Sequence, residues 1–381
     1  MKKLFYLGLL GLALYEIANV YFIMPMPGSQ RMNSINVAYF LYTYRWWFRI
    51  LFGIMIMIGS TDAFSVQRKW IPVLATVPVI VIVYMFNFRM VADHMFLQPE
   101  HLVFKTKTEN TLTDSSVVVT VRHNGEAKAY PIRFIQYHHQ VRDTVGGKPV
   151  MVTYCNVCRT GRVFEPTVNG KPENFRLVGM DHFNAMFEDQ TTGSWWRQAN
   201  GEAITGPLKG SLLPELESNQ VNLRLFFTMY PEGKVMQVEQ KFRKSYDSTG
   251  RYERGRSKGK LTRTDSLSWQ DKSWVVGIDI NKKAKAFDWL DLKRMRVIND
   301  QVGDTPLVIV IGSDDQSFAA FRRTAEEKFV VRNDSLVGAN NKYDLMGRSA
   351  DGSRLLPVKA YQEFWHSWQT FHPNTETYKG E

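Results

Sequence analysis

Three long apolar stretches lie within residues 1–92, and they restrict the fold more than any other feature of the sequence. They cover about residues 4–24, 42–62 and 71–88. An α-helix crosses the hydrocarbon core of a bilayer with about 20 predominantly apolar residues. The sequence therefore predicts an anchor of three transmembrane helices over residues 1–92, with the lipid bilayer as a partner.

Basic residues near the ends of these stretches indicate their orientation. Positively charged residues accumulate on the cytoplasmic side of membrane proteins, and such residues occur at positions 2–3 and 68–69. This pattern predicts a multi-pass protein of the cytoplasmic (inner) membrane whose soluble region is extracytoplasmic, in the periplasm. Within the first span, Glu16 is expected to pair with Arg45 or Arg49, because an ionised group inside a membrane needs a partner.

The soluble part of the chain contains an internal repeat. When the sequence is shifted by 157 residues, several short stretches align without a gap. Ser116–Val119 aligns with Ser273–Val276, and Asp143–Gly146 aligns with Asp300–Gly303. A period this long indicates duplicated domains and not a solenoid.

Runs of β-branched residues bounded by turn residues dominate both copies. We therefore predict an α+β fold, mostly β, in which the bundle of three transmembrane helices precedes a duplicated β-rich unit. The first copy is expected at residues 100–240 and a second, degenerate copy at 267–381. Residues 241–266 between them are rich in Lys, Arg, Gly and Ser, which predicts a flexible basic linker or loop. The aromatic run at 364–371 has helical spacing and is expected to pack in a core.

Only two cysteines occur in the chain, Cys155 and Cys158, in a single Cys-x-x-Cys motif. A β-forming run lies on each side of the motif, so the helix N-terminus that activates thioredoxin-type cysteines is not predicted here. A tight turn between two strands instead resembles a metal-binding knuckle, in which both thiolates face one ion. A closed metal site would need further ligands from histidine, methionine or carboxylate.

The repeat suggests a third ligand. At the 157-residue shift, the second copy has Gly312, Asp315 and Met295 in place of Cys155, Cys158 and His138. The joint absence of all three suggests that they form one site. We therefore predict that Cys155, Cys158 and His138 bind copper or zinc, and that copper(I) is favoured if a methionine such as Met180 or Met186 joins them.

A second group of polar residues surrounds two tryptophans. Its members are Asp189, Thr192, Ser194, Trp196 and Gln198. They could line a cleft, or they could cap a turn and satisfy buried backbone groups. No serine–histidine elbow, P-loop, Rossmann glycine pattern or His-Glu-x-x-His motif is present in the sequence.

These motifs resemble the family catalogued as domain of unknown function 3179. The matching stretches are residues 129–132 with His138, 143–150, 152–158, 189–198, 201–208, and 364–368 with Pro373. The resemblance covers most of residues 115–378. The chain departs from the usual pattern at His139, where the family has an acidic residue, and at Arg159, where it has a small one. The family implies no established activity, but its members usually look exported, which supports an extracytoplasmic soluble region.

The sequence leaves three functions open. The first is a transition-metal site, the second is thiol–disulfide redox chemistry by the same two cysteines, and the third is a binding or scaffolding module in which the motif is an inert brace. None of the three decides whether the chain is an enzyme. The formal net charge of +11 comes without a nucleic-acid-binding signature, so no nucleic-acid partner is expected.

Overall fold

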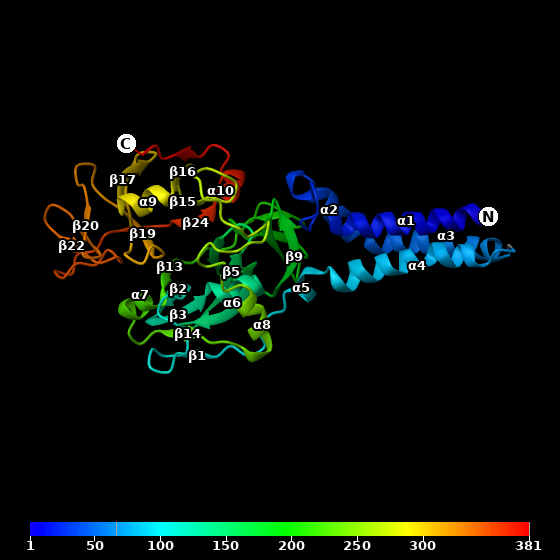
Figure 1. Cartoon of the computed structure of the whole chain (residues 1–381), viewed down its shortest axis with the longest axis horizontal. Helices are drawn as coiled ribbons and strands as arrows, with labels where there is room; N and C mark the ends of the chain where they lie inside the picture. Colours follow the sequence, from blue (N-terminus) through cyan, green and yellow to red (C-terminus); the bar gives the residue numbers. More distant parts are fainter. Residues whose placement is uncertain (66, 381) are drawn as a thin grey trace. The chain divides into compact units, whose positions relative to one another are not determined.

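The computed structural model describes residues 1–65 and 67–380, which divide into two compact units. The first, named the anchor unit, consists of Met1–Leu97, Glu173–Arg197 and Glu202–Leu212. The second, named the core unit, consists of Gln98–Pro172, Gln198–Gly201 and Leu213–Glu381. Figure 1 follows the chain through both of them by colour.

Three long helices form the N-terminal part of the anchor unit. They are α1 (Lys2–Tyr21), α3 (Arg45–Phe64) and α4 (Trp70–Tyr84), the last continued by the π-helical turn η2 (Met85–Arg89). All three run side by side (Figure 1) and are long and apolar enough to cross a membrane, which agrees with the predicted spans. Leucine, isoleucine and tryptophan side chains lie exposed along them, as expected of surfaces that face lipid.

One polar cluster joins the three helices to one another. Glu16 of α1 is 1% exposed, and Arg49 of α3 donates to both of its carboxylate oxygens, at 2.7 and 3.0 Å. Asn87 of η2 donates to the same carboxylate at 2.9 Å and accepts from Arg49. The predicted pairing of Glu16 with Arg49 is therefore confirmed. Because the two charges neutralise each other inside an apolar bundle, this cluster fixes how the helices pack.

A small antiparallel sheet completes the anchor unit. Its strands are β9 (Phe175–Asp181), β10 (Asn184–Asp189), β11 (Trp195–Arg197) and β12 (Ala203–Thr205), in the order β12-β11-β10-β9. The shorter helices are η1 (Ser29–Arg31), α2 (Ile35–Thr43) and α5 (Ala92–Met95). Met186 and Trp195 of the sheet pack with Val20, Ile23 and Ala38 from the N-terminal region in one buried apolar cluster. Strands that were expected within the first repeat thus pack with the anchor helices.

In the core unit, the two copies have the same elements at the predicted spacing. The first copy contains β2 (Val117–His123), β3 (Glu126–Pro131), α6 (Ile132–His138), β4 (Gln140–Val145), β5 (Lys148–Cys155) and β6 (Thr160–Phe164). The second contains β15 (Trp274–Ile280), β16 (Lys283–Asp288), α9 (Trp289–Met295), β17 (Val297–Val302), β18 (Thr305–Ile311) and β19 (Phe318–Arg322). From Val117 to Trp274 the shift is 157 residues, which confirms the duplicated β-rich unit.

Strand register and turn geometry repeat as well. Gln140 pairs with Thr153 between β4 and β5, and Val297 pairs with Val310 between β17 and β18. The tight turns β4–β5 and β17–β18 each contain a glycine with a left-handed backbone, Gly146 with φ of +53° and Gly303 with φ of +54°. Glycine adopts this conformation without steric cost, which explains why the turn sequence is shared.

A second set of elements repeats at a different shift. The first copy ends with β13 (Ser218–Asn222), α7 (Leu223–Met229) and β14 (Lys234–Met236), and the second ends with β24 (Tyr361–Phe364), α10 (Trp365–Phe371) and β25 (Glu376–Thr377). From Leu223 to Trp365 the shift is 142 residues, because the second copy is shorter in the middle. As predicted, the aromatic run at 364–371 forms a helix, and Trp368 in it is fully buried.

The sheets of the core unit follow this duplication. Their strand orders are β1-β14-β3-β2-β13 and β4-β5-β6 for the first copy, and β24-β15-β16-β25 and β17-β18-β19-β23 for the second. The remaining short strands are β1 (Phe104–Lys105), β7 (Thr167–Val168), β8 (Lys171–Pro172), β20 (Val330–Arg332), β21 (Ser335–Val337), β22 (Lys342–Tyr343) and β23 (Pro357–Val358).

Residues 241–266 differ from the flexible linker expected from their composition. They contain the end of η3 (Gln240–Phe242) and α8 (Arg243–Ser248). Phe242, Tyr246 and Tyr252 are buried in the hydrophobic core of the first copy. Three aromatic side chains outweigh the polar residues around them, because burying each one removes a large apolar area from water.

Candidate functional site

The cysteines lie on a hairpin between two strands, as the sequence predicted. Cys155 ends β5 and pairs with Thr160 at the start of β6, so Cys158 sits in the turn between them. Arg159 has a left-handed backbone with φ of +59°, which closes the turn. Both cysteine side chains are fully buried and form no disulfide.

The two thiols lie in contact with each other and with polar side chains from the far end of the chain. Burial raises the pKa of Cys158 well above its usual value, and a hydrogen bond with Cys155 raises it further. Ser367 of α10 and Lys272 lower the same pKa, because a hydroxyl donor and a nearby positive charge stabilise a thiolate. Cys158 therefore rests as a neutral thiol beside Cys155, next to groups that favour its ionisation.

Lys272 and His366 cover the turn. The Lys272 amine donates to the Val157 carbonyl at 2.6 Å and lies 3.0 Å from Nε2 of His366. Burial and the neighbouring lysine lower the pKa of His366 to about 3, so the imidazole is neutral. Burial also lowers the pKa of Lys272. Lys272 is 9% exposed, whereas His366 is partly exposed.

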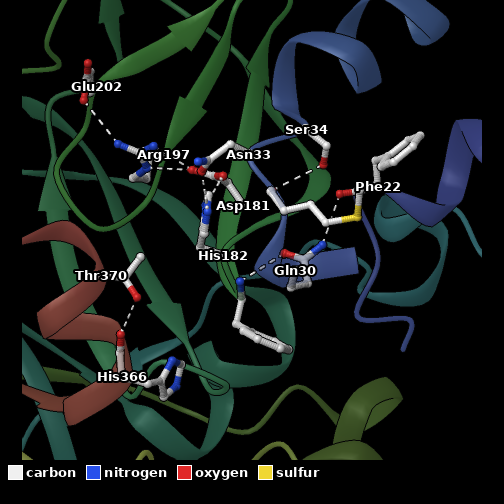
Figure 2. Close-up of polar contacts among 12 residues, drawn as sticks. Phe22, Gln30, Asn33, Ser34, Asp181, His182, Arg197, Glu202, His366 and Thr370 are labelled. Atoms are coloured by element: carbon white, nitrogen blue, oxygen red, sulfur yellow. Dashed lines mark hydrogen bonds and ion pairs between the residues drawn. The ribbon is translucent and has the colours of Figure 1, made fainter. Parts of the chain in front are cut away.

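A buried ion pair holds α10 against the hairpin. Glu363 accepts from Arg162 of β6 at 2.6 Å and from the Ser367 hydroxyl at 2.9 Å. Both charged side chains are nearly inaccessible, at 3% for Arg162 and 1% for Glu363. The backbone N–H of Phe364 donates to the Cys158 carbonyl at 2.8 Å, so β24 is hydrogen-bonded directly to the cysteine turn. Thr370 donates to the His366 carbonyl at 2.6 Å within α10 (Figure 2).

His138, the predicted third metal ligand, is engaged elsewhere. Its Nε2 shares a hydrogen bond of 2.7 Å with the Tyr246 hydroxyl, and its ring packs edge-on against Phe242. Among residues 1–65 and 67–380, no cluster of three or more His, Cys, Asp and Glu side chains has the arrangement of a metal site. The structure thus brings Cys155 and Cys158 together on one turn, and the His138 imidazole is hydrogen-bonded to Tyr246.

Four of the predicted cleft residues form a closed turn in the anchor unit. Asp189 is fully buried and accepts from the Thr192 hydroxyl at 2.8 Å, the Ser194 N–H at 3.1 Å and the Trp196 indole at 2.9 Å. These bonds match the turn-capping alternative. Gln198 belongs to the core unit.

Gln198 braces the cysteine hairpin. Its amide donates to the Thr153 hydroxyl and to the Thr160 carbonyl, both at 3.0 Å. Thr153 lies in β5 and Thr160 begins β6, so the fully buried amide links the two strands that carry the thiols. It acts on the site by fixing the hairpin.

A further polar network lies at the β9–β10 turn of the anchor unit (Figure 2). Asp181 accepts from Nδ1 of His182 at 2.6 Å and from two nitrogens of Arg197 at 2.9 and 2.6 Å. Burial alone would raise the pKa of Asp181, but His182 and Arg197 together lower it. His182 and Phe183 both have left-handed backbones, with φ of +51° and +67°. The network stabilises this strained hairpin turn.

Lys272, Glu363, His366 and Ser367 were not found from the sequence. They lie more than a hundred residues after the cysteines, and only the fold brings them to the hairpin. One available signal was the second repeat shift of 142 residues, which aligns α10 with α7. It would have shown that two polar residues of α10, His366 and Ser367, stand where α7 has Arg224 and Leu225.

Comparison with known proteins gives one match. A family model described as "Protein of unknown function (DUF3179)" matches residues 98–375. No curated protein and no solved structure matches the chain.

Proposed function

The chain belongs to the family of proteins of unknown function DUF3179, whose description names no activity, and we propose from the site geometry that Cys155 and Cys158 form a thiol–disulfide redox centre. The observation that carries this proposal is that Cys155 and Cys158 lie buried and without a disulfide on one hairpin, close enough for Cys155 to raise the pKa of Cys158. Two sulfurs in contact on one hairpin need only small rotations of their side chains to reach bonding distance.

The proposed reaction is a thiol–disulfide exchange, and residues around the cysteines assist it. A disulfide compound R–S–S–R is the proposed oxidant: a thiolate attacks one of its sulfurs, and the second cysteine then displaces the remaining thiol. The Cys155–Cys158 bond forms, the R–S–S–R bond breaks, and two protons and two electrons leave on two R–SH molecules. Lys272 stabilises the thiolate of Cys158 that this chemistry requires, and Ser367 adds to this when its hydroxyl turns from Glu363 to the sulfur.

Burial of the pair makes access the controlling step. Both thiols are fully buried, and Cys158 is protonated at neutral pH because its pKa is raised. Only thiolates attack disulfides, so exchange requires Cys158 to ionise beside Lys272 and requires a disulfide to reach the buried sulfurs past His366. A centre of this kind reacts slowly and selectively.

An extracytoplasmic location fits this chemistry and forms part of the proposal. Disulfides form and persist outside the cytoplasm, and the basic residues at 2–3 and 68–69 favour a multi-pass arrangement that exports the soluble region. Labelling an engineered cysteine at Ser257 with an impermeant reagent in intact spheroplasts tests this. In a Cys155→Ser/Cys158→Ser background, labelling only after lysis would contradict the orientation.

Copper or zinc binding remains the second candidate. Two adjacent cysteines are ligands for either ion, but His138 is hydrogen-bonded to Tyr246, and a site would need other donors. The metal hypothesis therefore predicts a different ligand set from the one expected on sequence grounds.

The deciding experiment uses the full-length protein in detergent. Because the chain has only two cysteines, thiol counting after equilibration in glutathione redox buffers reports this pair alone. We expect both thiols to disappear together with a two-electron dependence, and Cys158→Ser to abolish the transition. Metal analysis on the same samples separates the candidates, since one equivalent of copper or zinc bound through the thiols, with no disulfide formed, would refute the redox proposal.

His138→Gln serves as the matched control. It removes the imidazole that lies on Tyr246 but leaves the cysteine turn untouched. We expect an unchanged midpoint potential and a modest loss of stability of about 1 kcal/mol from the altered hydrogen bond.

A further inference from the structure

The core unit contains a cavity of about 350 Å³ beside the second copy. Its walls are formed by the loop around 253–267, by the start of α9, and by the turn Asp314–Gln316. This turn corresponds to Val157–Arg159 of the cysteine turn at the 157-residue shift. A volume of this size suits a small organic molecule.

One buried carboxylate in the cavity wall keeps an oxygen without a well-formed hydrogen bond in the described chain, although burial raises the pKa of this group and the nearby Ser268 hydroxyl lowers it. Asp288 is 1% exposed, and its Oδ1 accepts from the backbone N–H groups of Leu290 and Asp291 at 2.8 and 3.1 Å. Its Oδ2 makes no hydrogen bond of normal geometry with residues 1–65 and 67–380. A buried carboxylate oxygen left unsatisfied costs about 1–3 kcal/mol or more, so a ligand that donates to it gains this energy.

The other carboxylates of the cavity are already satisfied. Asp265 accepts from the backbone N–H of Lys272 at 3.0 Å, and Asp314 accepts from the Ser317 N–H at 2.8 Å. Asp315 forms an ion pair with Arg296. Asp288 is thus the carboxylate of this group with remaining capacity for a donor.

The cavity rim carries the opposite charge. Arg254, Arg256 and Lys293 line it, and none of them makes a side-chain hydrogen bond or ion pair within the described parts of the chain. Trp274 and Trp289 form an aromatic wall, with ring centroids 5.9 Å apart. Indole rings attract ammonium groups, and a guanidinium or ammonium rim attracts carboxylates.

We propose that this cavity binds a small amino acid, with its ammonium group on Asp288 and its carboxylate at the basic rim. The buried acceptor and the tryptophan wall select the cationic end, and the three basic residues select the anionic end. A ligand with both charges satisfies the buried acceptor and the rim at once. The site does not rest on the dithiol proposal, since neither cysteine lines the cavity.

A second acidic group supports a pH-dependent site. Burial raises the pKa of Glu253 to about 7, although Arg133 and Arg159 oppose this shift. Glu253 lines the same cavity and ionises as the pH rises through 7, which adds negative charge to the cavity wall. Affinity for an amine-bearing ligand should therefore increase between pH 6 and pH 8.

Four probes of similar length test the charge requirement on the full-length protein. They are 4-aminobutyrate, 4-hydroxybutyrate, butylamine and succinate, measured by isothermal titration calorimetry and tryptophan fluorescence. We expect 4-aminobutyrate to bind most tightly, by about 10-fold over each probe that lacks one of its two charges. Equal binding of 4-hydroxybutyrate, tightest binding of succinate, or no saturable binding at millimolar concentration would each overturn the proposal.

Two variants separate binding from folding. Asp288→Asn keeps an oxygen that caps α9 and should weaken 4-aminobutyrate by about 10-fold, whereas the exposed Asp304→Asn should not. Lys293→Gln lies at the rim and should weaken 4-aminobutyrate but leave butylamine unchanged; an equal loss for both probes would contradict the assigned orientation. Binding retained in Cys155→Ser/Cys158→Ser shows that this site stands even if the redox centre fails.

Discussion

The two copies of the core unit use one scaffold to build two different turns. The first turn carries Cys155 and Cys158, and the corresponding positions of the second carry Gly312 and Asp315. Each turn is covered by the closing elements of the other copy: Phe364 N–H donates to the Cys158 carbonyl, and Asn222 N–H donates to the Ser317 hydroxyl. Gln220 and Gln362, equivalent at the 142-residue shift, hydrogen-bond to each other at 3.0 Å between the copies.

The covering side chains differ in kind. The first turn faces Lys272, His366 and Ser367, whereas the position equivalent to Ser367 is Leu225, which packs against the apolar cluster of the second copy. The duplication thus conserved the exchange of covering elements and placed thiol chemistry on one side only. A shared fold fixes where a site can be built, and individual residues decide whether one is.

The largest effect should come from the anchors of the two covering helices. Trp368 of α10 and Phe226 of α7 are equivalent at the 142-residue shift, and both are fully buried. We expect Trp368→Ala and Phe226→Ala each to cost about 3–5 kcal/mol of unfolding free energy, measured by chemical denaturation. If only Trp368→Ala were destabilising, the two helices would not play equivalent structural roles.

The buried ion pair between Arg162 and Glu363 can be tested by substituting the residues found at the equivalent positions of the other copy. Where the first turn has Arg162 and Glu363, the second has Ala319 and Val221. Glu363→Val alone should cost about 3 kcal/mol, because it leaves a buried charge without its partner. Adding Arg162→Ala should recover part of this loss. A double variant as unstable as the sum of the single ones would show that the pair is not coupled.

The pH dependence of stability should reveal the contribution of His366, which covers the cysteine turn of the first copy. His366 has a folded pKa of about 3, against 6.5 as its ordinary value. Between these values the unfolded chain binds a proton that the folded chain does not, so stability falls as pH decreases, by at most about 1.4 kcal/mol per pH unit. His366→Gln should reduce the change of the thermal unfolding temperature with pH between pH 6.5 and 4. An unchanged slope would remove His366 as its source.

Glu253 acts in the opposite direction. Its folded pKa of about 7 exceeds the ordinary 4.5, so its contribution to stability is lost as pH rises between these values. Glu253→Gln measured beside His366→Gln therefore separates the two groups by the sign of their effects.

The smallest effect is expected at Asp315, the counterpart of Cys158. Its ion pair with Arg296 is half exposed, so Asp315→Ala should cost less than about 1 kcal/mol and leave the redox titration of the cysteines unchanged. Loss of the cysteine transition in this variant, with stability intact, would show that the second turn takes part in the chemistry of the first.

Local patterns predicted much of this architecture, and long-range contacts account for the rest. Hydropathy located three helices, and the 157-residue shift aligned β2–β6 with β15–β19, since strand patterns depend on neighbouring residues. The second shift was missed because a shorter middle segment changes the register before α10. The residues around the cysteine turn were incomplete for a similar reason, because Lys272 and His366 reach the turn only through the tertiary fold.

The packing of β9–β12 on the N-terminal helices has a consequence for how the protein is made and handled. The chain leaves the anchor unit after Leu97 and after Arg197, and it re-enters at Glu173 and at Glu202. The helices are synthesised first and provide the surface on which a sheet made later is completed. A truncated protein starting at Gln98 would expose Val178, Met186 and Trp195 to water and should aggregate. The N-terminal helices are therefore required for the folding of this sheet and cannot be removed like a flexible membrane tether.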